Sequence, residues 1–260
     1  MNDFKRIREL QVVNIQKVSL NMKRITFFSE DFFDFSMREK GAYFKFIFLN
    51  SKSLKKTNLV RPYTIRHFRK ERLEVDVDFA IHNKNSGIAS RWASIAKVGD
   101  KIKVSGPGAR QEIKKNADWY FFIGDMSALP AITSNLEELE ANSKGIVILE
   151  ILSKMDKIEI DKPDNIKVYW LINNVSYKKY DSKLLEKVSN IKWLPGMPFI
   201  WVACEFTKMK KLRDHFKFKK KINKENIYIS SYWRIGSDQE QHKSIKKKDS
   251  LDWGNFKKKL

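Results

Sequence analysis

Residues 61–66 read Arg61-Pro62-Tyr63-Thr64-Ile65-Arg66, and this hexapeptide decides how the rest of the chain is interpreted. Its β-branched and aromatic residues favour a strand, and Pro62 biases the preceding residue away from helix. Side chains alternate along a strand, so Arg61 and Tyr63 point to one face, and Thr64 lies beside them on the other. A guanidinium suits a phosphate, and a flat ring suits a planar heterocycle. The stretch therefore indicates a flavin-nucleotide site, although an ordinary edge strand fits the same residues.

The segments around the hexapeptide predict a small antiparallel barrel. In residues 73–81 every second side chain is a large apolar one, and Glu74, Asp76 and Asp78 lie between them, which is the pattern of a strand. A tight connection at residues 69–71 predicts that this strand forms a hairpin with the hexapeptide strand. The other β-rich stretches are residues 10–15, 22–28 and 43–48.

A helix is predicted to begin near residue 85. Small residues in its first turn leave backbone N–H groups open at the positive end of the helix dipole, which favours an anion. A plain capped helix is the alternative. The small residues are Gly87, Ala89 and Ser90, and the expected buried stripe is Ile88, Trp92 and Ile95. Further on, residues 106–108 read Gly-Pro-Gly and predict a loop near a domain boundary.

After residue 117, apolar strands alternate with helices, which predicts a parallel sheet covered by helices. Ligands of such sheets bind at the carboxyl ends of the strands. The residues at these ends are Asp125 and Ser127, then Ser153 and Lys154, then Cys204 and Glu205. No acid follows the second strand to hold ribose hydroxyls, so the sequence favours NADPH over NADH. The G-x-G-x-x-G fingerprint is missing.

The composition fits a folded protein of one large domain or two ordinary ones, with 260 residues of which 42% are hydrophobic. The single cysteine, Cys204, excludes an internal disulfide. No apolar run has the length of a membrane span, and no signal-peptide core follows the N-terminus. We therefore expect a cytoplasmic protein with no membrane insertion.

The formal net charge of +21 allows two interpretations. It indicates an anionic partner, or it reflects lysine-rich composition spread over solvated faces. The basic residues concentrate in residues 208–221 and 243–259. No nucleic-acid-binding motif is present, so we expect no nucleic acid as partner.

Several motifs recur in one order along nearly the whole chain. Together they resemble the siderophore-interacting proteins, the flavin-dependent ferric-siderophore reductases of the ferredoxin-reductase superfamily. Departures from the family pattern occur at Ile88, usually proline, at Met126-Ser127, usually Glu-Thr, and at Cys204 and Ser231, usually glycine. The motifs are Arg61–Thr64, Asp78–His82, Gly87–Ala93, Val98–Asp100, Ser105–Pro107, Gly124–Ile132, Trp201–Glu205 and Tyr232–Gly236.

The resemblance implies roles for individual residues. Tyr63 would stack on the isoalloxazine of FAD, Arg61 would meet the pyrophosphate and Thr64 the ring edge. The full set of expected FAD contacts is Arg61, Tyr63, Thr64, Asp78, Phe79, His82, Gly87, Ala89, Ser90 and Ser127. The expected contacts with the nicotinamide nucleotide are Asp125, Ser153, Lys154, Cys204 and Glu205.

The resemblance also implies the architecture. We expect an N-terminal FAD-binding antiparallel β-barrel in residues 1–115, a Rossmann-like NAD(P)H-binding α/β domain in residues 116–236, and a basic C-terminal tail in residues 237–260. The tail is expected to hold a short helix at residues 239–248, with a solvated lysine tail as the alternative.

The implied activity passes electrons from NAD(P)H through FAD to chelated Fe(III), with Fe(II) released in the cytoplasm by a monomer. Anionic ferric siderophores would meet Arg234, Lys243, Lys246 and Lys247. One alternative is a flavin reductase for a protein partner such as ferredoxin or flavodoxin. Another is a basic binding protein with no enzymatic activity.

Overall fold

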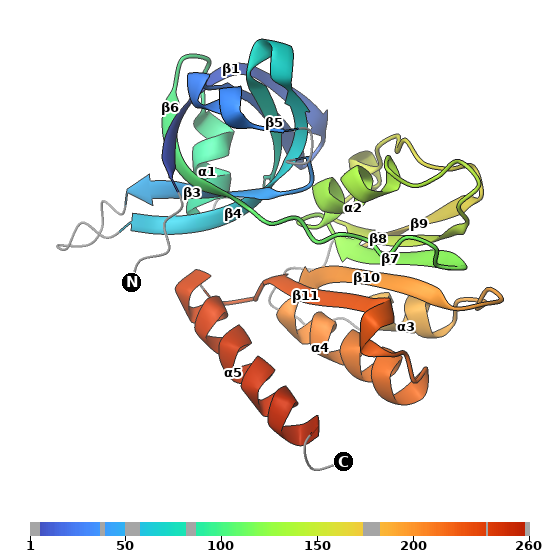
Figure 1. Ribbon diagram of the computed structural model, residues 1–260. Coiled ribbons are helices and arrows are strands. Elements are labelled where there is room, and N and C mark those ends of the chain that lie inside the picture. The colour runs from blue at the N-terminus through green and yellow to red at the C-terminus, as the bar shows by residue number, and fades with distance from the viewer. Residues whose placement is uncertain are drawn as a thin grey trace.

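The computed structural model describes residues 6–36, 40–49, 58–81, 87–173, 183–237 and 239–257. They form a closed antiparallel barrel followed by a five-stranded parallel sheet with helices on both faces (Figure 1). The predicted fold class is confirmed. The predicted boundary at residues 115–116 falls in the connection between the barrel and the sheet, while the three-part division stays a prediction.

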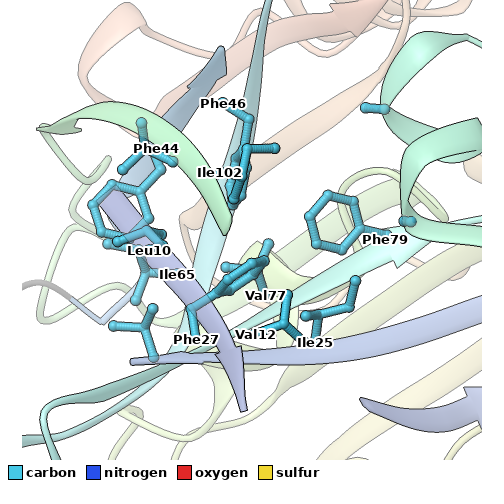
Figure 2. Close-up of a cluster of buried hydrophobic side chains, with 14 of the residues drawn as sticks. Leu10, Val12, Ile25, Phe27, Phe44, Phe46, Ile65, Val77, Phe79 and Ile102 are labelled. Carbon is cyan, nitrogen blue, oxygen red and sulfur yellow. The ribbon is translucent and has the colours of Figure 1, made fainter. Parts of the chain in front are cut away.

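The barrel closes in the strand order β1-β2-β5-β4-β3-β6. Large apolar side chains fill it, and Figure 2 shows Phe27, Phe44, Phe46 and Phe79 among them. Helix α1, Ile88–Ile95, packs on this core through Ala89 and Ala93. The strands are β1 Ile7–Ser19, β2 Met22–Phe28, β3 Tyr43–Leu49, β4 Asn58–Arg69, β5 Glu74–Ala80 and β6 Lys101–Gly108, with short 3₁₀ turns at Glu30–Asp34 and Lys70–Arg72.

Two details of the barrel differ from expectation, whereas the β4–β5 hairpin is confirmed. Ile95 is 73% exposed, because the chain leaves the helix at Ala96 in an extended conformation and Ala96 turns inward instead. The Gly106-Pro107-Gly108 stretch ends strand β6, where Gly108 pairs with Tyr43. A side chain at Gly108 would clash with the Tyr43 ring, so this close approach requires glycine.

The parallel sheet has the order β11-β10-β7-β8-β9. Along β10, Trp201 and Ala203 pack in the cluster with α2, and Val202 and Cys204 pack on the opposite face with α3 and α4. We call the opposite face the far face, because barrel residues pack only in the cluster with α2 among the described residues. The elements are β7 Trp119–Asp125, α2 Leu129–Leu136, β8 Gly145–Ile151, β9 Ile166–Ile172, α3 Lys183–Ser189, β10 Pro198–Glu205, α4 Phe206–Asp214, β11 Ile227–Trp233 and α5 Gln239–Lys257, with short turns at Lys154–Asp156 (3₁₀), His215–Lys219 (π) and Lys224–Asn226 (3₁₀).

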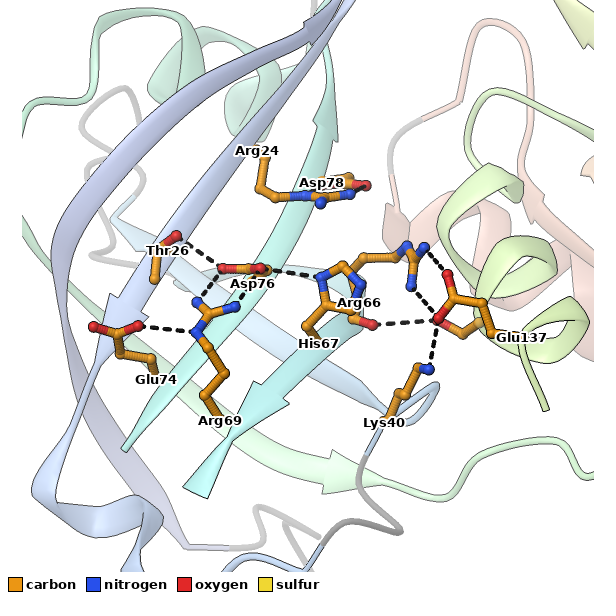
Figure 3. Close-up of polar contacts among 11 residues, drawn as sticks. Arg24, Thr26, Lys40, Arg66, His67, Arg69, Glu74, Asp76, Asp78 and Glu137 are labelled. Carbon is orange, nitrogen blue, oxygen red and sulfur yellow. Dashed lines mark hydrogen bonds and ion pairs between the residues drawn. The ribbon is translucent and has the colours of Figure 1, made fainter. Parts of the chain in front are cut away.

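Two acids join the barrel to the sheet. Asp156, fully buried, accepts hydrogen bonds from Ser19 Oγ at 2.8 Å and from the backbone N–H of Asn21 at 2.7 Å. Glu137, just after α2, pairs with Arg66 of β4 and with Lys40 (Figure 3). Burial alone would raise the pKa of Glu137, but the two cations outweigh it and lower this pKa to about 2. The junction is therefore held by charge as well as by apolar packing.

Within the described ranges, no helix combines the length and the apolar character that crossing a bilayer requires. The same residues contain no cluster of His, Cys, Asp or Glu arranged to bind a metal ion.

Candidate flavin and nucleotide site

Tyr63 stands in β4 with its ring packed on the barrel core. Its ring centroid lies 4.4 Å from that of Phe79 and 5.7 Å from that of Phe46, which it meets edge-on. Burial raises the pKa of the Tyr63 hydroxyl well above its usual value, so the phenol stays neutral. Two phenylalanines thus hold the ring in place, and a ring held this way is preorganised to stack on a planar ligand.

Within the described residues, no side chain crowds the backbone at the start of α1. Gly87 precedes the helix and supplies no capping side chain, and a Cβ placed there would meet none of the described atoms within 4 Å. The first N–H groups of a helix have no partner inside the helix and lie at the positive end of its dipole. Arg61, in β4 of the same barrel, is half-buried and donates to the Val60 carbonyl at 2.8 Å. A guanidinium and an open helix start are the groups that suit a diphosphate.

Asp125 ends β7 at the carboxyl edge of the sheet, and it is 7% exposed. Its Oδ1 accepts from the backbone N–H of Ser127 at 2.9 Å and from Ser127 Oγ at 2.5 Å. Its Oδ2 accepts from the Glu205 N–H at 3.0 Å and from Trp233 Nε1 at 2.8 Å. Burial raises the pKa of Asp125, and the hydrogen bonds offset this only in part. One carboxylate thus ties together the ends of β7, β10 and β11.

Two more acids lie at this edge. Glu205 is 2% exposed and caps α4, accepting from the N–H groups of Thr207 at 2.6 Å and Lys208 at 3.1 Å. Glu150, near the end of β8, binds the ammonium of Lys208 and accepts from Asn173 Nδ2 at 2.8 Å. The edge is therefore a buried polar platform in which the Lys208 side chain links β8 to α4.

Both halves of the chain match family models. Residues 50–111 match the siderophore-interacting FAD-binding domain, and residues 117–236 match the siderophore-interacting protein model. The chain belongs to the siderophore-interacting protein family.

Similar proteins with related names align with this chain over most of their length. The ferric vibriobactin reductase ViuB of Vibrio cholerae is 28% identical, over 93% of this chain and 95% of that protein. The NADPH-dependent ferric-chelate reductase of Escherichia coli is 23% identical, over 89% of this chain and 94% of that protein. The crystal structure of SipS from Aeromonas hydrophila has a TM-score of 0.84 at 28% identity, covering 96% of this chain and 99% of SipS.

The predicted family, and with it an FAD-dependent oxidoreductase, is confirmed. The matched FAD-binding domain contains β4, β5 and α1. These elements carry groups that fit FAD: a fixed aromatic ring, a guanidinium, and a helix start with space around Gly87. A Cβ added at Gly87 would meet no described atom within 4 Å.

Some predicted FAD contacts cannot be made by side chains of this siderophore-interacting protein. Asp78 is engaged by Arg24 through bonds of 2.6 and 2.8 Å (Figure 3), and the Phe79 ring is fully buried in the barrel. Contact from these two residues would have to come from their backbone. His82 lies outside the described residues. Thr64 is half-buried, while Ala89 and Ser90 are buried in the first turn of α1.

The predicted nicotinamide contacts divide in a similar way. Asp125 and Glu205 are brought together at the carboxyl edge, as the strand order requires. The prediction for the Cys204 thiol is wrong, because strand alternation buries this side chain completely on the far face and burial raises its pKa. Ser153 is engaged in capping a 3₁₀ turn, where its Oγ accepts from the Met155 N–H at 3.2 Å. Lys154 is exposed beside it.

The predicted substrate lysines are only partly brought together. The C-terminal region forms a 19-residue helix, α5, which is longer than expected. Lys246 donates to Ser230 Oγ at 2.6 Å and to the Ser231 carbonyl at 3.1 Å, at the edge of β11. Lys243, Lys246 and Lys247 are all exposed, and Arg234 lies over the Phe206 ring at 5.5 Å. Lys246 therefore has partners within the protein that would compete with a substrate, and the predicted substrate role of all four residues stays a hypothesis.

Two residues at the edge, Glu150 and Lys208, were not predicted from the sequence. Glu150 interrupts an otherwise apolar strand, a signal that could have revealed it, because a buried charge needs a partner. Lys208 has no such signal, since it opens a run of several lysines.

Proposed function

We propose that this protein is a ferric-siderophore reductase that passes electrons from NAD(P)H through FAD to chelated Fe(III). The observation that carries the proposal is the match of both halves to the siderophore-interacting family, combined with a polar carboxyl edge beside the flavin domain. The named activities of the Vibrio cholerae and Escherichia coli relatives support it. FAD, when bound, accepts two electrons together and releases them singly, which matches a hydride donor to a one-electron acceptor.

In this proposal the barrel holds the cofactor. Tyr63 would hold the flavin ring, while Arg61 and the start of α1 at Gly87, with Ala89 and Ser90, would hold the phosphates. Thr64 and Ser127 approach the ring edge from the two halves. Ser127 suits this position because Asp125 orients its hydroxyl.

The carboxyl edge of the sheet would receive the nicotinamide nucleotide. Asp125 and Glu205 fix the ends of three strands there, so the backbone that faces the nucleotide is preorganised. The acids near the end of β8 are occupied, Glu150 by Lys208 and Asp156 by the barrel turn. Lys154 is exposed at the same place. A cation without a competing acid favours the extra phosphate of NADPH.

An anionic ferric chelate would meet Arg234, which follows Trp233 at the same edge. Lys243 and Lys247 add positive charge along α5, whose N-terminal end lies near β4 (Figure 1). Reduction loosens the iron because the hard chelate oxygens hold Fe(III) more tightly than Fe(II). We take release to occur in the cytoplasm, from a monomer.

One experiment separates flavin binding from the reaction. The Arg61→Gln variant should lose about tenfold or more in FAD affinity, the effect of removing one charge-assisted phosphate contact. Arg72→Gln, an exposed arginine of the β4–β5 turn, is the matched control and should keep wild-type occupancy in the absorbance spectrum. Full occupancy in Arg61→Gln with an intact fold would remove Arg61 from the site.

The donor and the acceptor are tested next, in anaerobic stopped flow. NADPH should reduce the bound flavin faster than NADH, and a ferric catecholate should reoxidise it. Equal rates with both nucleotides would reject the preference for NADPH. Reduction only by reduced ferredoxin would transfer the donor role to a protein partner. Arg234→Gln should weaken apparent affinity for an anionic ferric catecholate and leave a neutral ferric hydroxamate unaffected.

A further inference from the structure

One strongly basic surface has no part in the proposed reaction. It follows α4, where the π turn His215–Lys219 and the residues after it carry five lysines and no acid between positions 217 and 224. Lys217 Nζ lies 5.0 Å from the ring centroid of Trp253, and the Phe218 ring lies 5.6 Å from the same indole. Lys220 Nζ lies 4.6 Å from the ring of Trp193. These contacts flank a run of consecutive basic residues. We name the set the basic–aromatic strip, and it consists of Trp193, Lys217, Phe218, Lys219, Lys220, Lys221 and Trp253.

The strip presents apolar and cationic groups together. Phe218 is 46% exposed although it sits among lysines, and both tryptophans are only half-buried. Lys219 and Lys221 are exposed. An exposed aromatic ring with a rim of lysines is unusual for a merely solvated face, which carries polar residues alone.

The strip lies away from the flavin. The residues that anchor it, Leu212 and Phe216, belong to the far-face cluster, whereas the barrel packs on the other face of the sheet. Figure 1 shows α4 and the C-terminal half of α5 on the side opposite the barrel. Whatever binds the strip leaves the junction between barrel and sheet open.

We propose that the basic–aromatic strip binds the surface of an anionic lipid bilayer without spanning it. Tryptophan and phenylalanine side chains settle at the boundary between headgroups and acyl chains. Lysines reach the lipid phosphates while their apolar stems stay on the aromatic rings. Each lysine near an anionic leaflet adds attraction that salt screens.

The observations favour lipid over two other anionic partners. Single-stranded nucleic acid stacks successive bases on several open aromatic rings. Of the three rings in the strip only Phe218 is exposed, because Arg213 lies 4.3 Å from the Trp253 ring and Lys220 lies over Trp193. A protein that delivers electrons must approach the flavin, and the strip is on the opposite face of the sheet. A lipid surface requires neither condition.

Flotation of the full-length protein with vesicles tests the proposal. Wild type should float with vesicles rich in phosphatidylglycerol and remain behind with phosphatidylcholine alone. Lys219→Gln/Lys221→Gln should weaken binding by about fivefold per lysine, the equivalent of about 1 kcal/mol each. Phe218→Ala should weaken it by about tenfold, because it removes the ring that enters the interface. The matched control, Lys97→Gln/Lys103→Gln, removes the same charge from exposed lysines of the barrel half and should bind like wild type.

Circular dichroism and flavin occupancy establish that each variant is folded. Equal binding to both vesicle types, no binding to either, or equal loss in the barrel control would overturn the proposal. Displacement of the vesicles by single-stranded DNA at stoichiometric concentration would also overturn it, because the strip would then prefer nucleic acid.

Discussion

Asp76 in the barrel and Asp125 at the carboxyl edge are both buried carboxylates, but their partners are of opposite kinds. Asp76 is 4% exposed and receives bonds of 2.7 and 2.8 Å from the guanidinium of Arg69, with Thr26 at 2.8 Å (Figure 3). The hydrogen-bond donors to Asp125 among the described residues are all neutral: backbone N–H groups, a hydroxyl and an indole.

The two environments move the pKa in opposite directions. Burial would raise the pKa of Asp76, but hydrogen bonds from Arg69, His67 and Thr26 outweigh it and hold this pKa well below its usual range. Burial also raises the pKa of Asp125, and its neutral donors are too weak to reverse the shift. The barrel thus neutralises its buried charge locally, which serves stability. The edge keeps a perturbed acid at the proposed nucleotide site, and perturbed acids are typical of functional sites.

The largest effect should come from breaking the barrel pair. Asp76→Asn keeps the shape but leaves Arg69 with Glu74 as its one acidic partner among the described residues. Removing one member of a buried ion pair costs about 3 kcal/mol of the free energy of unfolding, at the low end because Arg69 is partly exposed. Urea denaturation measures the loss. If Asp76→Asn lowered the free energy of unfolding by less than about 1 kcal/mol, the value for an exposed ion pair, the charged partners of Asp76 would not distinguish it from Asp125.

The junction acid should show the same behaviour through pH. The folded pKa of Glu137 is depressed from 4.5 to about 2, so its stabilising effect is complete above 4.5 and is lost as the pH falls toward 2. Glu137→Gln should cost about 2 kcal/mol at neutral pH and nothing near pH 2. Urea midpoints of both proteins across this range provide the measurement. A difference that persists at the acid end would contradict a charge-based junction.

The carboxyl edge should respond in function more than in stability. Asp125→Asn retains one acceptor oxygen for neutral donors, so we expect a cost of about 1 kcal/mol. Flavin reduction by NADPH should slow about tenfold, because the ends of three strands lose their common anchor. The pKa of Asp125 is shifted upward, whereas the pKa of Glu137 is shifted downward. Wild type therefore loses stability as the pH rises through the folded pKa of Asp125, and the variant does not.

Asp118→Asn is the matched control for the edge. Asp118 accepts the Met197 N–H at 2.6 Å at the start of β7, the opposite end of the sheet from Asp125. Asp118→Asn should lower the free energy of unfolding by about as much as Asp125→Asn and leave the rate of flavin reduction unchanged. A slower rate in both variants would mean that the effect is general loosening of the sheet.

The sequence predicted the strand of residues 73–81 correctly, but not the burial of its polar side. Period-two alternation reports which residues share a face. It cannot report that Arg24 and Thr26 come from a distant segment to cover Asp78 and Asp76. Pairing between residues some fifty positions apart depends on barrel closure, which local patterns do not contain.

For Cys204 and for α5, the periodicity of the sequence contains more information than the predictions used. Alternation along β10 places Cys204 with Ile200 and Val202, so its burial on the far face followed from the strand assignment itself. In α5, helical spacing aligns His242, Ile245 and Asp249, which predicts the inward face and the longer helix. The basic–aromatic strip was harder to predict, because its two tryptophans meet the lysine turn only in three dimensions.

The smallest effect should come from an exposed pair on the barrel, Lys101 with Glu9 at 3.0 Å. Both side chains are at least half exposed, so water and salt screen their attraction, and ordering two long side chains opposes it. Lys101→Gln should therefore change the free energy of unfolding by less than about 0.5 kcal/mol, with no pH dependence between 4.5 and 2 beyond that of wild type. The same urea series measures it. If this variant cost as much as Asp76→Asn, the depressed pKa of Asp76 would report general surface charge, and the contrast between a paired barrel acid and an unpaired edge acid would lose its physical basis.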